Sequence, residues 1–273
     1  MPEDQQQHRK DAENEDVQEL SAPRSPVIYE VVRRQGQEEL ERPVGSLFWS
    51  GFAAGIAIMA SVIAQGALMH KLPPGTPGRE VIAELGYSLG FLLVILGRMQ
   101  LFTEQTIVTV LPNMAEPGWH RFATTARLWG IVFLANMLGT AAAAFINIRF
   151  HLVSPELAHS MLEVSAKLLP MTPSEVLLQG IPAGFLIASV AWIRAAASGG
   201  EFAIVLVLTY AIALGGFTHV VAGAAEAFLL LFDAQAGLGQ VLGGMILPAL
   251  VGNVIGGTGL FALLVHAQVR QEM

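Results

Sequence analysis

A single histidine stands in the middle of a long apolar run. Residues 208–230 read LTYAIALGGFTHVVAGAAEAFLL, with His219 flanked by Gly215, Gly216 and Gly223. An imidazole can donate a hydrogen bond or exchange a proton near neutral pH. Burial in apolar surroundings favours its uncharged form. This chemistry suits either the binding or the protonation of a small polar solute.

A comparable interruption occurs in an earlier apolar region. The stretch YSLGFLLVILG runs into RMQLFTEQ and resumes as TIVTVLP. Here Phe102-Thr103-Glu104 can be laid over Phe217-Thr218-His219. We therefore expect two matched breaks that together form one central site. A threonine that bonds to its own helix, or a histidine that bonds two helices together, is the structural alternative.

The composition indicates the elements that must hold these residues. Of 273 residues, 53% are hydrophobic and 14% are charged, and the mean hydropathy is +0.55. These values are typical of an integral membrane protein rather than a soluble domain. A membrane helix needs roughly 20 mostly apolar residues. Six such spans are expected, near residues 45–69, 81–112, 122–148, 173–197, 201–232 and 237–267.

The six spans divide into two halves, each with a broken middle member. With three spans per half, the second half is inverted relative to the first, and paired breaks then indicate a central site. Backbone that leaves a helix inside a membrane is tolerated only beside a cavity or within protein. The new helix N-termini favour an anion there. The predicted fold is all-α, with six transmembrane helices in two inverted three-helix repeats and broken second and fifth helices.

Glycine pairs elsewhere are interpreted as packing sites. Small residues four apart allow close helix crossings, and this spacing occurs at Gly51/Gly55, Gly239/Gly243 and Gly252/Gly256. Thr172 and Glu175 have the spacing of a capping box, which predicts that the fourth span begins there.

The chain is expected to comprise three regions. Residues 1–24 form a polar tail of disordered composition without the apolar core of a signal peptide, residues 25–43 an interfacial amphipathic helix, and residues 44–268 the six-span domain. The net charge of −7 says little about partners, because much of the acidity lies in the tail, and no nucleic-acid partner is expected. Most Lys and Arg residues near span ends fall on one side if both termini are cytoplasmic. That group contains Arg33, Arg34, Arg42, Arg121, Arg127, Arg194 and Arg270, against Lys71, Arg79, Arg149 and Lys167 outside.

Several motifs in this order resemble the formate/nitrite transporter family. They are YSLGF followed by LFT, then GGFTHVVAG, then VGNVIGG, within a similar six-span layout over about residues 25–268. The resemblance implies an aquaporin-like protomer, assembled as a homopentamer in a bacterial inner membrane, with a path through each protomer. It implies transport of small monovalent anions of weak acids, such as formate, nitrite, lactate or hydrosulfide, often with a proton and without a cofactor.

The resemblance also implies roles for individual positions. His219 matches the central histidine of the family and Thr103 the threonine of its mobile loop. Lys167 resembles the lysine that draws anions to the outer vestibule, although a solvated lysine without a role is an equal alternative. Asn253 matches a polar position in the sixth span and is expected to line a vestibule. The positions that match constriction residues are Leu101, Phe102, Tyr87, Phe91 and Ile212.

The chain departs from the family pattern around both breaks, as a divergent branch would. Arg98, Met99 and Gln100 replace small or acidic residues before Leu-Phe-Thr, and Thr218 replaces an acidic residue before the histidine. A charge within a span normally faces a cavity or a partner. One hypothesis pairs Arg98 with Glu104 or Glu226 at the cytoplasmic vestibule, where the pair meets the anion. In the alternative, Arg98 extends to the interface or closes a structural ion pair.

Other functions remain as alternatives. A neutral small-solute pore suits the same architecture, although the Asn-Pro-Ala pair of aquaporins is missing, and a non-conducting scaffold or sensor could share the fold. An intramembrane metalloenzyme is disfavoured, because the other histidines fall in the tail, loops or span ends and HExxH is absent. No catalytic residue, metal or cofactor is therefore expected. Whether His219 relays a proton or only donates a hydrogen bond stays open.

Overall fold

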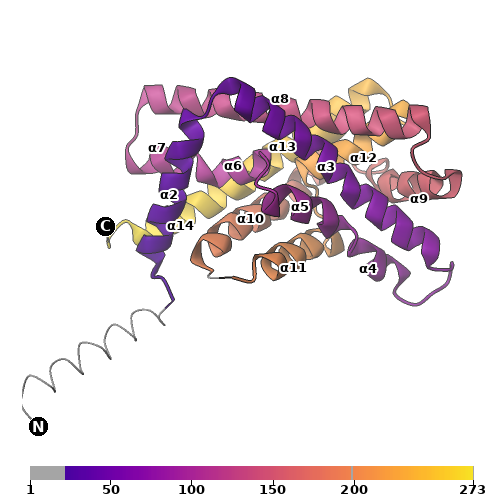
Figure 1. Ribbon diagram of the computed structural model, residues 1–273, viewed down its shortest axis with the longest axis horizontal. Coiled ribbons are helices and arrows are strands. Elements are labelled where there is room, and N and C mark those ends of the chain that lie inside the picture. Colours follow the sequence, from indigo (N-terminus) through magenta and orange to yellow (C-terminus); the bar gives the residue numbers. More distant parts are fainter. Residues whose placement is uncertain (1–21, 198, 273) are drawn as a thin grey trace, which may run out of the picture.

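The computed structural model describes residues 22–197 and 199–272 (Figure 1). Within these residues, four helices are long and apolar enough to cross a membrane. They match the first, third, fourth and sixth expected spans. They are α3 (Val44–Lys71), α8 (Trp119–Phe150), α10 (Pro173–Ala196) and the continuous helix Gln240–Val269, which consists of η2 (Gln240–Ile246), α13 (Leu247–Val254), η3 (Ile255–Ala262) and α14 (Leu263–Val269).

The second and fifth spans are broken into half-helices. The second consists of α5 (Tyr87–Leu96) and α6 (Phe102–Val108), followed by the short α7 (Leu111–Ala115). The fifth consists of α11 (Glu201–Leu214) and α12 (Val220–Phe232). The prediction of an all-helical, six-span fold with two interrupted helices is confirmed.

The two halves pack by the same close helix crossing. A Cβ atom added to Gly55 on α3 would lie 2.3 Å from the carbonyl oxygen of Asn136 on α8. In the second half, a Cβ on Gly184 of α10 would lie 2.2 Å from the carbonyl oxygen of Asn253. Only glycine permits such an approach of two backbones. The first and third members of each half are therefore held at one matched distance.

The expected packing glycines fall into two groups. A Cβ on Gly51 would meet Ala135 at 2.9 Å, and a Cβ on Gly252 would meet the Leu177 carbonyl oxygen at 2.3 Å. The packing prediction is confirmed for these pairs. It is wrong for the remaining pair, because a Cβ there would have no described atom within 4 Å, as is the case at Gly239 and Gly243.

Shorter helices gather at the two ends of the bundle. One end carries α2 (Ser25–Glu41), which contacts α7 and α14, and the other carries α4 (Arg79–Glu84), α9 (Pro155–Ser165) and η1 (Ala166–Leu168) (Figure 1). The fully buried Tyr29 of α2 lies 2.7 Å from His266 Nδ1 of α14, hydroxyl oxygen to ring nitrogen. Both ends of the described chain thus share one end of the molecule. A disordered tail is expected at residues 1–24. Residues 1–21 of it lie outside the described residues.

The fourth span begins where the sequence predicts. Thr172 Oγ1 accepts the backbone N–H of Glu175, and the Glu175 carboxylate accepts the backbone N–H of Thr172 at 2.8 Å. This reciprocal pair is a capping box that satisfies donors left free at a helix start. It fixes the beginning of α10 next to the first of the two cavities described below.

Candidate functional site

The first half-helix of each broken span ends in the same backbone motif. Arg98 follows α5 with φ of 52°, and Gly216 follows α11 with φ of 63°. The next residue in each case donates a hydrogen bond back into the helix, from Met99 N to Val94 O at 2.9 Å and from Phe217 N to Ile212 O at 3.0 Å. This left-handed ending is a Schellman motif. It stops both helices and redirects the chain by the same geometry.

The second half-helices also start alike, which sets the register between the breaks. Leu101 precedes α6 with φ −104° and ψ 122°, and His219 precedes α12 with φ −99° and ψ 125°. LGRMQLF therefore matches LGGFTHV, and Leu101 is the counterpart of His219. The overlay of the two Phe-Thr pairs was wrong. The overlay matched residue types, whereas the backbone alignment is determined by the left-handed residue that follows each first half-helix.

Asn253 holds the second break in place. Its Oδ1 accepts the N–H of Val220 at 2.8 Å, and its Nδ2 donates to the carbonyls of Gly180 and Thr218 at 2.8 and 2.9 Å. Backbone groups freed by a break need such partners away from water. Asn253 is fully buried, so its prediction as a vestibule residue is wrong. It positions His219 from behind.

Asn136 plays the same part at the first break. Its Oδ1 accepts the N–H of Phe102 at 2.9 Å, and its Nδ2 donates to the carbonyls of Gly51 and Gln100 at 2.8 and 2.9 Å. Asn136 was not predicted from the sequence. The signal was present, because Asn136 and Asn253 both stand three residues before a glycine that packs at the helix crossing.

Thr103 and His219 meet where the two second half-helices begin. Thr103 Oγ1 lies 2.6 Å from His219 Nε2, and both side chains are buried. The other ring nitrogen, Nδ1, accepts the N–H of Ala222 at 3.2 Å and so caps α12. An accepting Nδ1 assigns the proton to Nε2, in the neutral tautomer. The imidazole therefore donates its hydrogen bond to Thr103.

Aromatic rings close the space beside this pair. The ring of Phe91 lies edge-on to that of His219, with centroids 4.9 Å apart, and Tyr87 lies 5.0 Å from Phe91. Phe91, Leu101 and Ile212 have no solvent-exposed surface. His219 and Thr103 thus lie in a buried, mostly apolar region, here called the constriction.

Phe102 points away from that constriction. Its ring packs against Trp129 and Phe133 of α8, with centroids 5.6 and 5.3 Å apart. The same three residues line an apolar cleft together with Leu250 and Val254 of the sixth span. The side chains alternate at the start of α6, so Leu101 and Phe102 face different neighbours. The structure does not bring Phe102 to the site.

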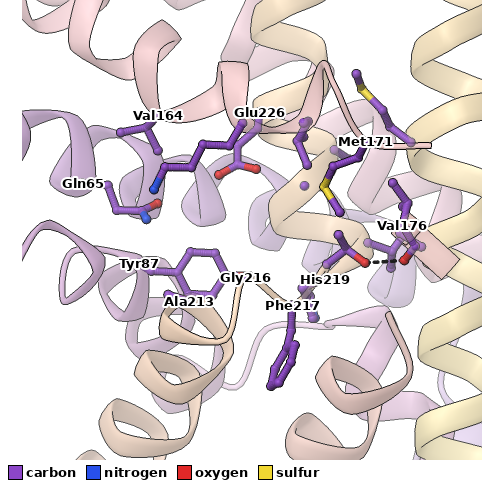
Figure 2. A pocket seen from close by; sticks show the side chains of 18 of the residues that line it. Gln65, Tyr87, Val164, Met171, Val176, Ala213, Gly216, Phe217, His219 and Glu226 are labelled. Carbon is purple, nitrogen blue, oxygen red and sulfur yellow. Dashed lines mark hydrogen bonds between the residues drawn. The ribbon is translucent and has the colours of Figure 1, made fainter. Parts of the chain in front are cut away.

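Two cavities lie on either side of the constriction. One, here called the histidine cavity, has a volume of about 340 Å³ and reaches His219 (Figure 2). The other, the arginine cavity, is also about 340 Å³ and is lined by Arg42, Arg98 and Arg194. Val176 of α10 lines the first and Ala191 the second, a separation of about 22 Å along the helix at 1.5 Å per residue. Each cavity opens toward a different end of the bundle.

The histidine cavity contains two of the residues predicted for a vestibule, Lys167 and Glu226. Lys167 Nζ lies 2.6 Å from Glu84 Oε1, so this lysine is paired rather than free. Glu226 lines the same cavity, as do Tyr87 and Gln65 (Figure 2). The hypothesis that Glu226 pairs with Arg98 is wrong, because the two residues lie in different cavities.

The arginine cavity is organised by Arg194 instead of Arg98. Arg194 Nη1 lies 3.1 Å from Glu104 Oε1, and its Nε lies 3.0 Å from Glu201 Oε2. The other predicted partner of Arg98, Glu104, is therefore held by Arg194. Arg98 is exposed, and within the described residues it forms no ion pair. From the sequence, Arg194 was expected only as one of the cytoplasmic charges. Its contact with Glu104 was not predicted.

Metal binding finds no support in the described part of the chain. Among residues 22–197 and 199–272, no cluster of three or more His, Asp or Glu side chains could hold an ion. The chemistry available at the constriction is that of an imidazole N–H, a hydroxyl and helix N-termini, all of which are hydrogen-bond donors.

Comparisons with known proteins give one consistent result. A family model described as Formate/nitrite transporter matches residues 26–267. Inner membrane protein YfdC of Escherichia coli (strain K12) is 38% identical over 250 residues, covering 92% of this chain and 80% of the relative. Uncharacterized transporter YrhG of Bacillus subtilis (strain 168) is 27% identical over 249 residues, covering 87% and 90%.

Two solved structures share the fold. A chain described as FNT family ion channel superposes with a TM-score of 0.74 and 19% identity, covering 89% of this chain and 98% of that chain. A pentameric formate channel with formate bound superposes with a TM-score of 0.71 and 19% identity, covering 84% and 98%.

Proposed function

Because the chain belongs to the formate/nitrite transporter family, we propose that it carries small monovalent anions of weak acids, such as formate or nitrite, through each protomer. The observation that carries the proposal is the Thr103–His219 pair, buried between two cavities at the meeting point of two helix N-termini. The substrate moves from one cavity to the other past this pair.

The pair supplies donors matched to an anion's oxygen atoms. When the 2.6 Å bond opens, His219 Nε2–H and the Thr103 hydroxyl are both free to donate. Charge-assisted hydrogen bonds to an oxyanion are roughly twice as strong as neutral ones. The donors thus offset part of the hydration that an anion loses on entering the constriction.

A proton travels with the substrate in this proposal. A bare anion between Phe91, Leu101 and Ile212 meets a large desolvation cost, whereas the neutral acid does not. His219 contributes as a donor and not as a relay, because protonation at Nδ1 would set two N–H groups against each other at Ala222. The proton comes from the bulk solvent through the aqueous cavity, because leaving water raises the pKa of the acid that the anion forms.

The setting in the cell is proposed from relatives and from charge. A homopentamer is proposed because a solved structure with this fold is described as a pentameric formate channel. A bacterial inner membrane is proposed because the 38% identical relative is described as an inner membrane protein. Arg194 and Arg42 line the arginine cavity, so the positive-inside rule places that cavity and both termini in the cytoplasm.

The test is solute uptake by proteoliposomes at pH 5 and pH 7. Formate and nitrite should enter faster at pH 5, and His219→Phe should reduce uptake at least about tenfold. His120→Phe, at an exposed position on α8, is the matched control and should retain uptake. His219→Gln separates a hydrogen-bond donor from a proton relay, because an amide donates a hydrogen bond but does not take up or release a proton near neutral pH. Glycerol flux that is independent of pH, without formate flux, would instead identify a neutral-solute pore.

A further inference from the structure

The histidine cavity contains a buried acceptor without a partner. Gln65 is 3% exposed, and its Nε2 donates to Glu84 Oε2 at 2.5 Å. Its Oε1 is buried and has no hydrogen-bond partner among the described residues. An amide oxygen left in this state carries the full cost of its lost hydration. A ligand that donates a hydrogen bond into the cavity would remove that cost.

A second acceptor in the same cavity is Glu226. Its carboxylate points into the open space, on the side of the cavity where Gln65 and the ring of Tyr87 also lie (Figure 2). Within residues 22–197 and 199–272 it has neither a hydrogen bond nor an ion pair. Lys167 also lines the cavity and is bound to Glu84. The cavity thus presents two acceptors that receive no hydrogen bond from the described residues.

The charge balance of the cavity is negative. The titratable side chains that line it are Glu80, Glu84, Tyr87, Lys167, His219 and Glu226. His219 is neutral through its cap on α12, and Lys167 compensates Glu84 alone. A cation bound beside Glu226 would hold this buried group in its charged, carboxylate form, and together with Glu80 it would then favour cations over anions. The cavity therefore opposes the charge that the donors at the constriction favour.

We propose that the histidine cavity binds a small primary ammonium ion, whose N–H groups donate to Gln65 Oε1 and to the Glu226 carboxylate. An ammonium group has three donors and one positive charge, which matches the two unpartnered acceptors and the excess of carboxylates. The volume of about 340 Å³ admits such an ion with some of its water. This site takes a weak base, and it does not depend on the proposed transport of weak acids.

The experiment uses the full-length protein in lipid nanodiscs at pH 7, with radiolabelled methylammonium as the probe. Equilibrium dialysis should show saturable binding. Glu226→Gln, which keeps the shape and removes the charge, should weaken binding at least tenfold, and Gln65→Leu should weaken it about threefold or more. Glu41→Gln removes the same charge from an exposed position on α2 and should leave binding unchanged.

Competitors define the recognition chemistry. Unlabelled ethylammonium should displace the probe, whereas tetramethylammonium, which has the charge but no N–H, should not, and formate should not. The proposal is overturned if the wild-type protein shows no saturable binding, if Glu226→Gln binds as tightly as the wild type, or if tetramethylammonium competes equally.

Formate uptake by the same preparation keeps the two proposals apart. Formate uptake without methylammonium binding would overturn the ammonium site alone. Methylammonium binding without formate uptake would support the ammonium site and contradict the proposed anion transport.

Discussion

The two helix breaks share one backbone and differ in their chemistry. Both end a half-helix with a left-handed residue, both begin the next with an extended residue, and both are bridged by an asparagine from the third helix of their half. At matched positions, however, the first break carries Arg98 and Leu101 where the second carries Gly216 and His219. The fold therefore needs the backbone motif at both breaks, whereas it needs the imidazole at only one of them.

The largest effect is expected from removing the asparagine bridges. Asn253→Leu and Asn136→Leu each leave one N–H and one carbonyl of a break unpaired and remove a further bond to a carbonyl of the neighbouring helix. Buried groups without partners cost about 1–3 kcal/mol each, so each variant should lose about 3 kcal/mol or more of stability. The measurement is thermal unfolding in detergent, followed by size-exclusion chromatography.

Asn147→Leu is the matched control for both bridges. Asn147 is buried on α8, but its Nδ2 bonds only to Ala143 one turn away, and its Oδ1 is unpartnered in the described structure. This variant should lose less than about 1 kcal/mol. A large loss for Asn253→Leu with none for Asn136→Leu would break the equivalence of the two breaks.

The next effect concerns the double use of the imidazole. His219→Asn keeps a side chain that caps helices well but cannot reach Thr103, so stability should change by less than about 0.5 kcal/mol while formate uptake falls at least about tenfold. His219→Leu copies the first break, loses the cap as well, and should cost about 1 kcal/mol more. Unfolding and uptake are measured on the same preparations. Equal loss of stability in both variants would show that the cap does not depend on Nδ1.

A smaller effect is expected from the charge beside the second break. Glu226→Gln removes an unpaired carboxylate from the cavity that reaches His219, so formate uptake at low concentration should rise about two- to fivefold, equivalent to about 0.5–1 kcal/mol. The increase should shrink in high salt, because screening weakens charge effects. Glu41→Gln should leave the rate unchanged. Lower uptake in Glu226→Gln would mean that the carboxylate assists the anion.

The smallest effect tests the left-handed positions themselves. A residue with a Cβ is destabilised by about 1–2 kcal/mol in this conformation, but glycine loses about 0.5–1 kcal/mol more backbone entropy on folding, so Arg98→Gly should stabilise the protein by about 0.5 kcal/mol. Gly216→Ala should destabilise it by a similar amount. Thermal unfolding of the two variants checks this prediction, and opposite signs are required. A loss of stability in Arg98→Gly would show that the arginine side chain has a stabilising contact.

Much of the architecture was predictable because it depends on patterns within short stretches. Apolar runs of membrane length located the six spans, and polar or glycine-rich letters inside two of them located the breaks. Thr103 and His219 were predictable as central residues because each stands in one of these two interruptions. The capping box at Thr172 was equally local.

The remaining features depend on contacts that no short stretch encodes. The register of the breaks follows from the positive φ angle of Arg98. Arginine is not a residue type that predicts a left-handed conformation. The outward direction of Phe102 follows from its neighbours on α8. The partner of Glu104 is Arg194, far along the chain, and electrostatic pairs of this kind are decided by which helix ends meet.

The two uses of His219 limit which part of the site can move. Its ring is fixed by the cap on α12, and the backbone around it is fixed by Asn253. The Thr103 hydroxyl forms no second hydrogen bond within the described residues, so we expect its side chain, rather than the imidazole, to turn when the pair opens. The backbone just before Thr103 is connected to α2, because Gln100 Nε2 donates to Glu39 Oε2 at 2.8 Å. The N-terminal helix is thus linked to the start of α6 through the side chain of Gln100.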